Sequence, residues 1–234
     1  MILNILASHY VESAKAATES VVDRDRFLVL ATGFLNDAER IERLNIFTIL
    51  IKGNLMLLRK EYDQALVAFR GSLQQNPTFI PALIGCASIL FKQKDFKGAL
   101  ERYQTVLRLN PDISPDVRVP IGICFAELGM EDEAIAAFNR AIELDAENIN
   151  AIVLASVMNA NKSKTPSLST MERNALLANG NQQLLQAFKM NVKHSVVANE
   201  MAERFFSKSL YHKVLEIVCL SDENCSDTTM IHIL

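Results

Sequence analysis

The sequence predicts an all-α protein in which helix pairs stack into a right-handed superhelix, an α-solenoid of about five and a half pairs. Three observations lead to this fold class. The chain repeats itself with a period of 34 residues, half of its residues are hydrophobic, and it holds only 8 glycines and 6 prolines in 234 residues. So few turn-forming residues argue against a many-stranded sandwich or barrel, and the apolar content argues against a disordered chain.

The repeat is clearest in the middle of the chain. Residues 53–77 and 87–111 align without a gap, and residues 122–146 follow after one extra residue. Two features recur in all three segments: an alanine, and an aromatic residue four places after it. These are Ala65, Ala99 and Ala134, followed by Phe69, Tyr103 and Phe138. This pattern is the signature of the tetratricopeptide repeat, in which two antiparallel helices approach closely at small residues and bulky residues fill the space between them.

Extending this frame in both directions divides the whole chain. The expected segments are a divergent repeat with a long hairpin (1–45), three regular repeats (46–79, 80–114 and 115–148), a repeat with a loop insertion near 161–172 (149–194), an incomplete repeat (195–220) and a polar tail (221–234). Pro120 falls five residues into an expected helix and cannot donate a backbone hydrogen bond. We therefore expect a kink or a later helix start at this point.

Composition narrows the function. The 24 basic and 27 acidic residues give a net charge of −3, so direct nucleic-acid binding is not expected. A membrane span is not expected either, because no stretch of about 18 uncharged apolar residues is present. The four cysteines form no Cys-x-x-Cys pair, which favours free thiols in a reducing compartment over disulfides or zinc. No catalytic motif is present, and the histidines share no metal-ligand spacing (His9, His194, His212 and His232). The sequence predicts a non-enzyme without cofactor or metal.

The first helices of stacked pairs line an inner groove, and the repeat frame identifies the side chains that face it. The predicted groove residues are Phe47, Leu50, Asn54, Leu57, Leu58, Ile84, Ser88, Phe91, Lys92, Val119, Ile123, Val153 and Val157. Most are aliphatic or aromatic, which favours an amphipathic helix or an extended partner segment as the occupant. The alternative is that long helices pack on their neighbours and fill the groove.

Some tetratricopeptide co-chaperones hold a terminal carboxylate with Lys, Arg and Asn at these groove positions. Here Leu50, Ile84 and Val119 stand where such a clamp needs lysine, and only Asn54 and Lys92 are polar candidates. A separate polar stretch, residues 163–170, is rich in Ser and Thr. It reads either as a segment that a kinase could reach or as an ordinary flexible insertion.

Several stretches resemble one particular family. Residues 76–87, 94–100 and 107–111, and above all Asp116-Val-Arg-Val-Pro-Ile-Gly-Ile-Cys-Phe125, are similar to the tetratricopeptide scaffold subunit of the RNA polymerase II-associated factor complex. Residues 202–206 and 211–214 echo two later helices, with Glu203 and Arg204 in place of the usual polar pair. Pro120 departs from the family, which usually has glycine there. Family members are several times longer, so the resemblance implies a fragment.

The resemblance implies a nuclear, non-enzymatic scaffold that supports transcription elongation. Its expected partners are the other subunits of the elongation-factor complex, bound through apolar helical or extended segments in the groove, with RNA polymerase II contacted indirectly. Such a scaffold couples the elongating polymerase to histone ubiquitylation and methylation. The alternative is a cytosolic co-chaperone or trafficking adaptor with the same fold.

Overall fold

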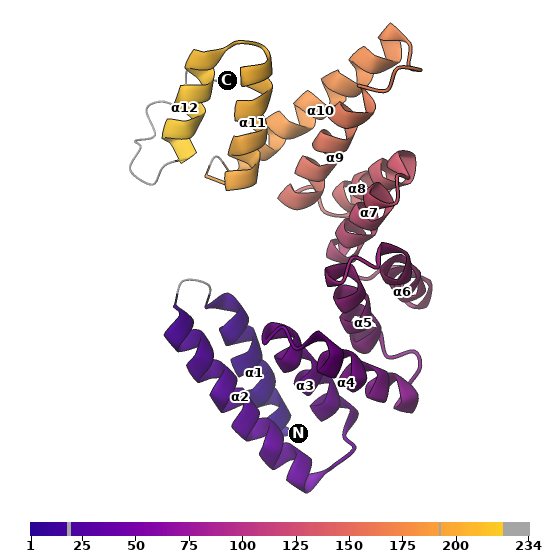
Figure 1. The fold of residues 1–234 in the computed structure, drawn as a ribbon, viewed down its shortest axis with the longest axis vertical. Helices are drawn as coiled ribbons and strands as arrows, with labels where there is room; N and C mark the ends of the chain where they lie inside the picture. The colour runs from indigo at the N-terminus through magenta and orange to yellow at the C-terminus, as the bar shows by residue number, and fades with distance from the viewer. Residues whose placement is uncertain (18–19, 192, 222–234) are drawn as a thin grey trace. The chain divides into compact units, whose positions relative to one another are not determined.

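The computed structural model describes residues 1–17, 20–191 and 193–221, and within them it contains helices and turns but no strand. The helices form two compact units, one from Met1 to Ile113 and the other from Ser114 onward. Consecutive helices pack as pairs in both units, as the ribbon in Figure 1 shows. The predicted all-α tetratricopeptide fold class is confirmed.

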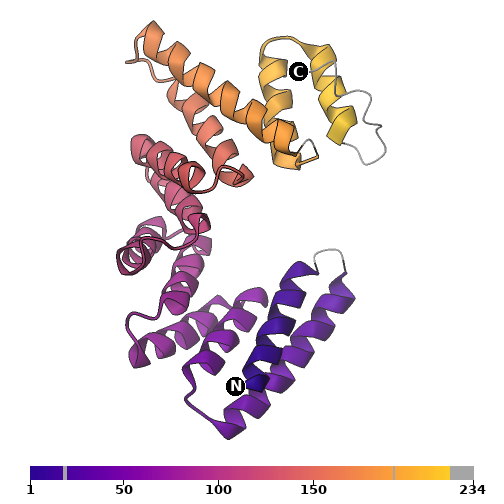
Figure 2. The same ribbon diagram turned by 180° about the vertical axis from the view of Figure 1, so that it is seen from behind.

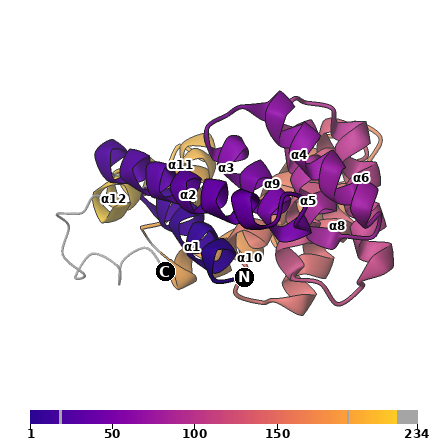
Figure 3. The same ribbon diagram turned by 90° about the horizontal axis from the view of Figure 1, so that it is seen from below.

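Unit 1 consists of three helix pairs. They are α1 (Ile2–Ala16) with α2 (Val21–Ile41), α3 (Ile46–Leu58) with α4 (Tyr62–Gln75), and α5 (Ile80–Lys92) with α6 (Phe96–Leu109). Successive pairs contact each other through α1–α3, α2–α3, α3–α5 and α4–α5. The side-by-side packing of α1 and α2 is also visible from below in Figure 3. First helices therefore neighbour first helices along this unit.

Unit 2 opens with a short 3-10 turn and continues with three more pairs. They are η1 (Pro115–Val117) leading into α7 (Arg118–Glu127), paired with α8 (Glu131–Leu144), then α9 (Ile149–Lys162) with α10 (Thr170–Met190), and α11 (Ser195–Ser207) with α12 (Tyr211–Ser221). Helix α11 contacts both α9 and α10. The last pair, which the sequence treats as an incomplete repeat, can be followed from behind in Figure 2. Of the expected polar tail, residues 222–234 lie outside the described residues.

Pro120 is accommodated by a late helix start. The 3-10 turn occupies residues 115–117 and α7 begins at Arg118, which places Pro120 in the first turn of the α-helix. Backbone N–H groups of the first turn have no partner within their own helix, so the missing donor of proline costs little there. The expected later helix start at Pro120 is confirmed.

One core cluster in each unit contains a ring packed against glycine. The Phe69 side chain of α4 is fully buried. A Cβ atom added at Gly53 in α3 would lie 2.6 Å from this ring, and one added at Gly85 in α5 would also lie 2.6 Å from it. Phe138 of α8 lies against Gly122 of α7 in the same manner. At Gly53, Gly85 and Gly122 an aromatic ring thus occupies the space that a Cβ methyl group would fill.

Four of the turns between paired helices, those after α3, α5, α7 and α11, contain a residue in the left-handed conformation. Lys60, Lys94, Gly129 and Ser209 each follow the first helix of a pair with positive φ, between 59° and 77°. The backbone N–H of Lys60 donates to Leu57 O and that of Glu61 to Met56 O, which satisfies carbonyls at the end of α3. Only one of the four residues is glycine, although this left-handed region favours it.

Extra residues in the first and fifth pairs lengthen the second helix. Both α2 and α10 have 21 residues, against 14 in α4. The segment from Ser163 to Ser169 joins α9 to α10, and the Ser169 side chain accepts a hydrogen bond from Glu172 N while Glu172 accepts from Ser169 N. This capping box fixes the start of α10. Within the Ser/Thr-rich stretch, Ser163 is buried and Ser169 caps α10, while Ser167 and Thr170 are exposed.

Candidate functional site

The predicted groove residues lie on the first helices of their pairs. In unit 1 they come from α3 and α5, which contact each other, and in unit 2 from α7 and α9, which also do. We call the first set the unit 1 face; its members are Phe47, Leu50, Asn54, Leu57, Leu58, Ile84, Ser88, Phe91 and Lys92. The unit 2 face consists of Val119, Ile123, Val153 and Val157. Each unit therefore carries its own candidate surface.

The unit 1 face is apolar and partly open. Phe47 at the start of α3 is 55% exposed, and its ring packs edge-on against Phe79 with 5.8 Å between ring centroids. Leu50 and Leu57 are half-buried against the cluster around Phe69. Ile84 of α5 is also half-buried. These side chains leave hydrocarbon surface available to a partner, which is the usual character of a protein-binding patch.

Polar groups on the unit 1 face are few. The Ser88 hydroxyl lies 3.3 Å from the Tyr103 hydroxyl, so it is engaged with the second helix of its own pair. Asn54 is half-buried and Lys92 is exposed near the end of α5. A surface with one amide and one ammonium group does not form a carboxylate clamp, because such a clamp needs several converging donors.

Leu58 differs from the other members of this face. Its side chain packs against the cluster formed by α1, α2 and α3, and its backbone carbonyl accepts a hydrogen bond of 2.8 Å from the Arg24 guanidinium. Leu57, the preceding residue, packs instead against the Phe69 cluster. The two neighbouring leucines therefore pack in different hydrophobic clusters, and Leu58 connects α3 to the pair formed by α1 and α2.

The unit 2 face is less accessible. Val119 and Ile123 are half-buried against the cluster around Phe138, and Val157 is half-buried against the cluster that α9, α10 and α11 share. Val153 is only 3% exposed and belongs to that shared cluster. Its side chain thus contributes to helix packing, as in the alternative that neighbouring helices fill the groove, and we omit it from the candidate surface.

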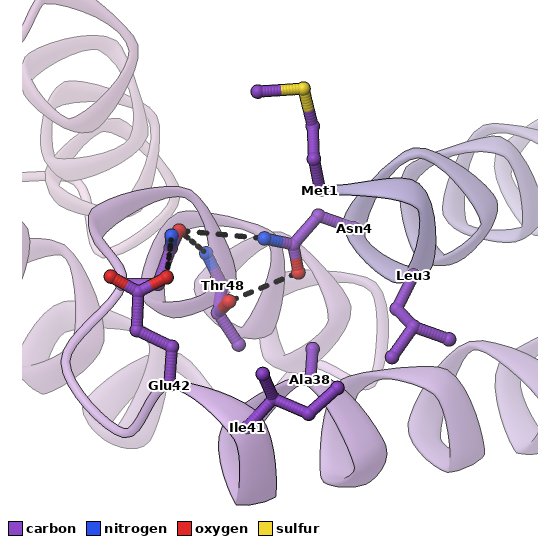
Figure 4. Close-up of a pocket in the computed structure, with 8 residues that line it drawn as sticks. Met1, Leu3, Asn4, Ala38, Ile41, Glu42 and Thr48 are labelled. Carbon is purple, nitrogen blue, oxygen red and sulfur yellow. Dashed lines mark hydrogen bonds between the residues drawn. The ribbon is translucent and has the colours of Figure 1, made fainter.

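A small cavity of about 40 Å³ lies where α1 and α2 meet the start of α3 (Figure 4). The Thr48 hydroxyl donates to Asn4 Oδ1 at 3.0 Å, and Asn45 Nδ2 donates to the Glu42 carboxylate at 2.8 Å. Asn45 Oδ1 also caps α3 by accepting from the N–H groups of Phe47 and Thr48. Met1 points away from these groups. The cavity has room for one or two water molecules. The polar atoms that line it are hydrogen-bonded to one another, so these residues connect α1 to the start of α3.

A larger cavity of about 230 Å³ lies between α10 and α11. Its lining residues are Asn181, Leu184, Leu185, Met201, Arg204, Phe205 and Lys208. The Arg204 guanidinium donates to Asn181 Oδ1 at 2.6 Å, to Ser156 O at 3.0 Å and to Ser156 Oγ at 2.5 Å. Sequence reasoning did not identify this site. The one sequence feature that could have pointed to this site is the presence of Glu203 and Arg204 where the family usually has another polar pair.

Burial shapes the electrostatics around Arg204. Desolvation lowers the pKa of its guanidinium, against the opposing influence of Glu200 and Glu203. Desolvation also raises the pKa of the Glu200 carboxyl, helped by the negative charge of Glu203 and opposed by Arg204 and Lys164. The cation at Arg204 is therefore held in a partly desolvated position by fixed hydrogen bonds, which strengthens its interaction with nearby charges.

Candidate chemistry elsewhere is sparse. Burial raises the pKa of the Cys86 thiol, although Arg102 and Arg70 partly oppose this effect, and burial chiefly, with Glu127, raises the pKa of Cys124 to about 11. Both thiols are buried and free, as expected from their apolar helices. The described residues contain no cluster of three or more metal-ligating side chains, and none of their helices is long and apolar enough to span a membrane.

Comparison with protein families identifies the repeat. A model of the tetratricopeptide repeat matches residues 56–112 and 90–156. Among solved structures, MamA from Desulfovibrio magneticus, solved from residue 41 to its end, is 17% identical with a TM-score of 0.61, and the match covers 81% of this chain and 97% of that one. YrrB, described as a tetratricopeptide protein with an unusual peptide-binding site, is 20% identical with a TM-score of 0.57, covering 83% of this chain and 98% of YrrB. At these identities the likeness concerns the fold.

Curated relatives extend the likeness along most of the chain. A CTR9 homologue of Arabidopsis thaliana is 32% identical over 205 residues, which are 88% of this chain and 18% of that protein. The RNA polymerase-associated protein CTR9 of Saccharomyces cerevisiae is 26% identical over 220 residues, 89% of this chain and 20% of that protein. The chain thus spans about one fifth of these relatives. It is a tetratricopeptide-repeat protein, and the relatives that it resembles over most of its length are CTR9 proteins.

Proposed function

We propose that this chain is a non-catalytic scaffold segment that holds other subunits of an RNA polymerase II-associated elongation complex. The observation that carries the proposal is the similarity, over 88% of the chain, to proteins named as RNA polymerase-associated. The open apolar side chains on the unit 1 face support it, because a scaffold needs surface that remains unfilled after its own helices have packed.

The unit 1 face is the part of the chain that binds a partner segment. Phe47 is a large, exposed anchor, and Leu50, Leu57 and Ile84 are half-buried apolar side chains on the same two helices. Fully burying an exposed side chain of this size contributes roughly 1.5–3 kcal/mol, and the half-buried leucines and isoleucine contribute the part that corresponds to their remaining exposed area. A few anchors of this kind are enough for a specific interface. The polymerase is contacted through the bound subunits, in the nucleus, and histone modification follows from their recruitment.

A carboxylate-binding co-chaperone is less compatible with the same surface. Leu50 of α3 and Ile84 of α5 are apolar where a clamp would place cations, and Ser88 is engaged with Tyr103. An isolated Lys92 gives weak, solvent-screened attraction for a terminal carboxylate. The chemistry of the unit 1 face therefore favours apolar anchoring over charge-assisted capture.

The test is recovery of polymerase-associated factors with the tagged chain from nuclear extract, measured by quantitative mass spectrometry. The double variant Phe47→Asp/Ile84→Asp should reduce recovery about tenfold, because each carboxylate would have to be desolvated at the interface. Val67→Asp on α4 is the matched control, since Val67 is 69% exposed and lies outside the unit 1 face. Circular dichroism checks that all variants keep their helices.

Two results would contradict the proposal. Recovery of chaperone C-termini in place of polymerase-associated factors would assign the chain to the co-chaperone class. Equal recovery by the wild type and by Phe47→Asp/Ile84→Asp would show that the unit 1 face is not the binding surface.

A further inference from the structure

The cavity between α10 and α11 has apolar walls. Leu184 is completely buried at its base, Leu185 and Phe205 are half-buried, and Met201 is 7% exposed. Its volume of about 230 Å³ is several times the roughly 30 Å³ share of one water molecule and below the 300 Å³ at which typical small-molecule pockets begin. The space therefore suits one large apolar side chain.

Cations surround this apolar space. Lys208 lines the cavity, and the Lys213 ammonium of α12 lies 5.3 Å from the centroid of the Phe205 ring. In the part of the chain that the structure describes, neither lysine forms an ion pair. Arg204 adds a third positive charge whose position is fixed by Ser156 and Asn181. Glu200 and Glu203 act on Arg204 from outside the lining residues, as Lys213 does on Phe205, so the three cations outnumber the two neighbouring carboxylates.

The orientation of Arg204 matters for this chemistry. Its guanidinium is anchored to α9 and α10 while its own backbone belongs to α11, so the charge cannot swing away when the cavity is empty. A fixed, partly desolvated cation attracts an incoming anion more strongly than a mobile surface lysine does, because no side-chain entropy is lost on binding.

From this geometry we propose that the cavity is a docking site for an acidic peptide segment of a partner protein, with one large apolar side chain as its anchor. The anchor lies on Leu184, Met201 and Phe205, and carboxylates on either side of it face Lys208, Lys213 and Arg204. The charge complementarity selects an acidic partner over a neutral or basic one. The site belongs to unit 2 alone and is separate from the unit 1 face.

The binding test uses the full chain and a short fluorescein-labelled peptide in which one leucine stands between pairs of glutamates, followed by fluorescence anisotropy. Lys208→Glu/Lys213→Glu should weaken binding about tenfold, because both rim charges are reversed. Lys189→Glu/Lys193→Glu makes the same change in net charge at two exposed positions outside the cavity, and should bind like the wild type. Binding should also weaken as salt concentration rises.

The apolar half of the site is tested with the peptide itself. Replacing its leucine by serine should weaken binding at least tenfold, because the lost burial is that of a whole aliphatic side chain. Equal affinity of the leucine and serine peptides would overturn the proposal, because the peptide would then bind through nonspecific electrostatic attraction without an apolar anchor. Equal affinity of the two lysine double variants would also overturn it. If the chain sediments as a dimer that only Lys208→Glu/Lys213→Glu dissociates, the occupant is a second copy and the assignment to a partner is wrong.

Discussion

The ring of Phe69 in α4 lies directly against the backbone of Gly85 in α5, so that one side chain closes the junction between two successive helix pairs. A methyl group at Gly85 would stand 2.6 Å from the ring, well inside van der Waals contact. The ring is fully buried and lies equally close to Gly53 of its own pair. It therefore has no room to retreat from an added atom.

We expect Gly85→Ala to lower the free energy of unfolding by about 1–2 kcal/mol, because overpacking outweighs the better helix propensity of alanine. Gly33→Ala is the control. Gly33 lies in α2 with nothing within 4 Å of an added Cβ, so the change should stabilise by about 0.5–1 kcal/mol. Urea titration of both variants measures the difference. Equal stabilisation by both would show that the Phe69 ring moves freely.

Left-handed turn residues offer a stabilising change. Lys60 and Lys94 have φ of 63° and 64°, which lysine adopts at a cost that glycine avoids. Lys60→Gly and Lys94→Gly should each raise the free energy of unfolding by about 0.5–1 kcal/mol, visible as a higher Tm. Glu101→Gly within α6 should lower it by about 1 kcal/mol. A loss of stability in the two turn variants would refute the assigned conformation.

The hydrogen bonds between Arg204 and Ser156 connect α11 to α9. Arg204→Ala should cost about 2 kcal/mol of unfolding free energy, since three charge-assisted hydrogen bonds are lost. Arg140→Ala, which removes an exposed ion pair with Glu143, should cost less than about 0.5 kcal/mol. Chemical denaturation of both variants, combined with Ser156→Ala in a double-mutant cycle, measures the coupling. A coupling energy near zero would contradict the bonding described here.

Alkaline pH should weaken the fold through Cys124. Burial raises the pKa of this thiol from 9.0 to about 11, so between these values the unfolded chain loses the proton first. The unfolded state then binds fewer protons than the folded state, and stability falls as pH rises from about 9 to 11. Thermal melts of the wild type and of Cys124→Ala over this range isolate the effect, since the variant should show a shallower decline. Parallel curves would contradict it.

Helix pairing was predictable from the sequence because the alternation of small and aromatic residues reflects contacts inside each pair, such as Gly53 with Phe69. The late start at Pro120 was predictable for a similarly local reason, the missing backbone donor. Both inferences depend on residues that are close in the chain or fixed by the repeat, so an alignment of the chain with itself was sufficient to reach them.

The binding surface was harder to predict. The repeat frame places Val153 on the groove side of its helix, yet in the structure it is part of the core shared by α9, α10 and α11. The frame also cannot anticipate that Leu58 packs against α1 and α2 while Leu57 does not. The cavity beside Arg204 depends on contacts between residues 48 positions apart, for which the sequence offered only an unusual residue pair.

The hydrogen bonds of Arg204 also determine how α11 is rotated about its axis when it packs on α9 and α10. A rotation of α11 by one residue would turn the guanidinium about 100° away from Ser156 and leave a desolvated cation without acceptors. Apolar contacts such as those of Met201 tolerate a slip of this kind far better, because they have no directional requirement. The Arg204 hydrogen bonds therefore specify the rotational alignment of α11 against α9 and α10. This specificity for one alignment is a different property from the free energy of unfolding.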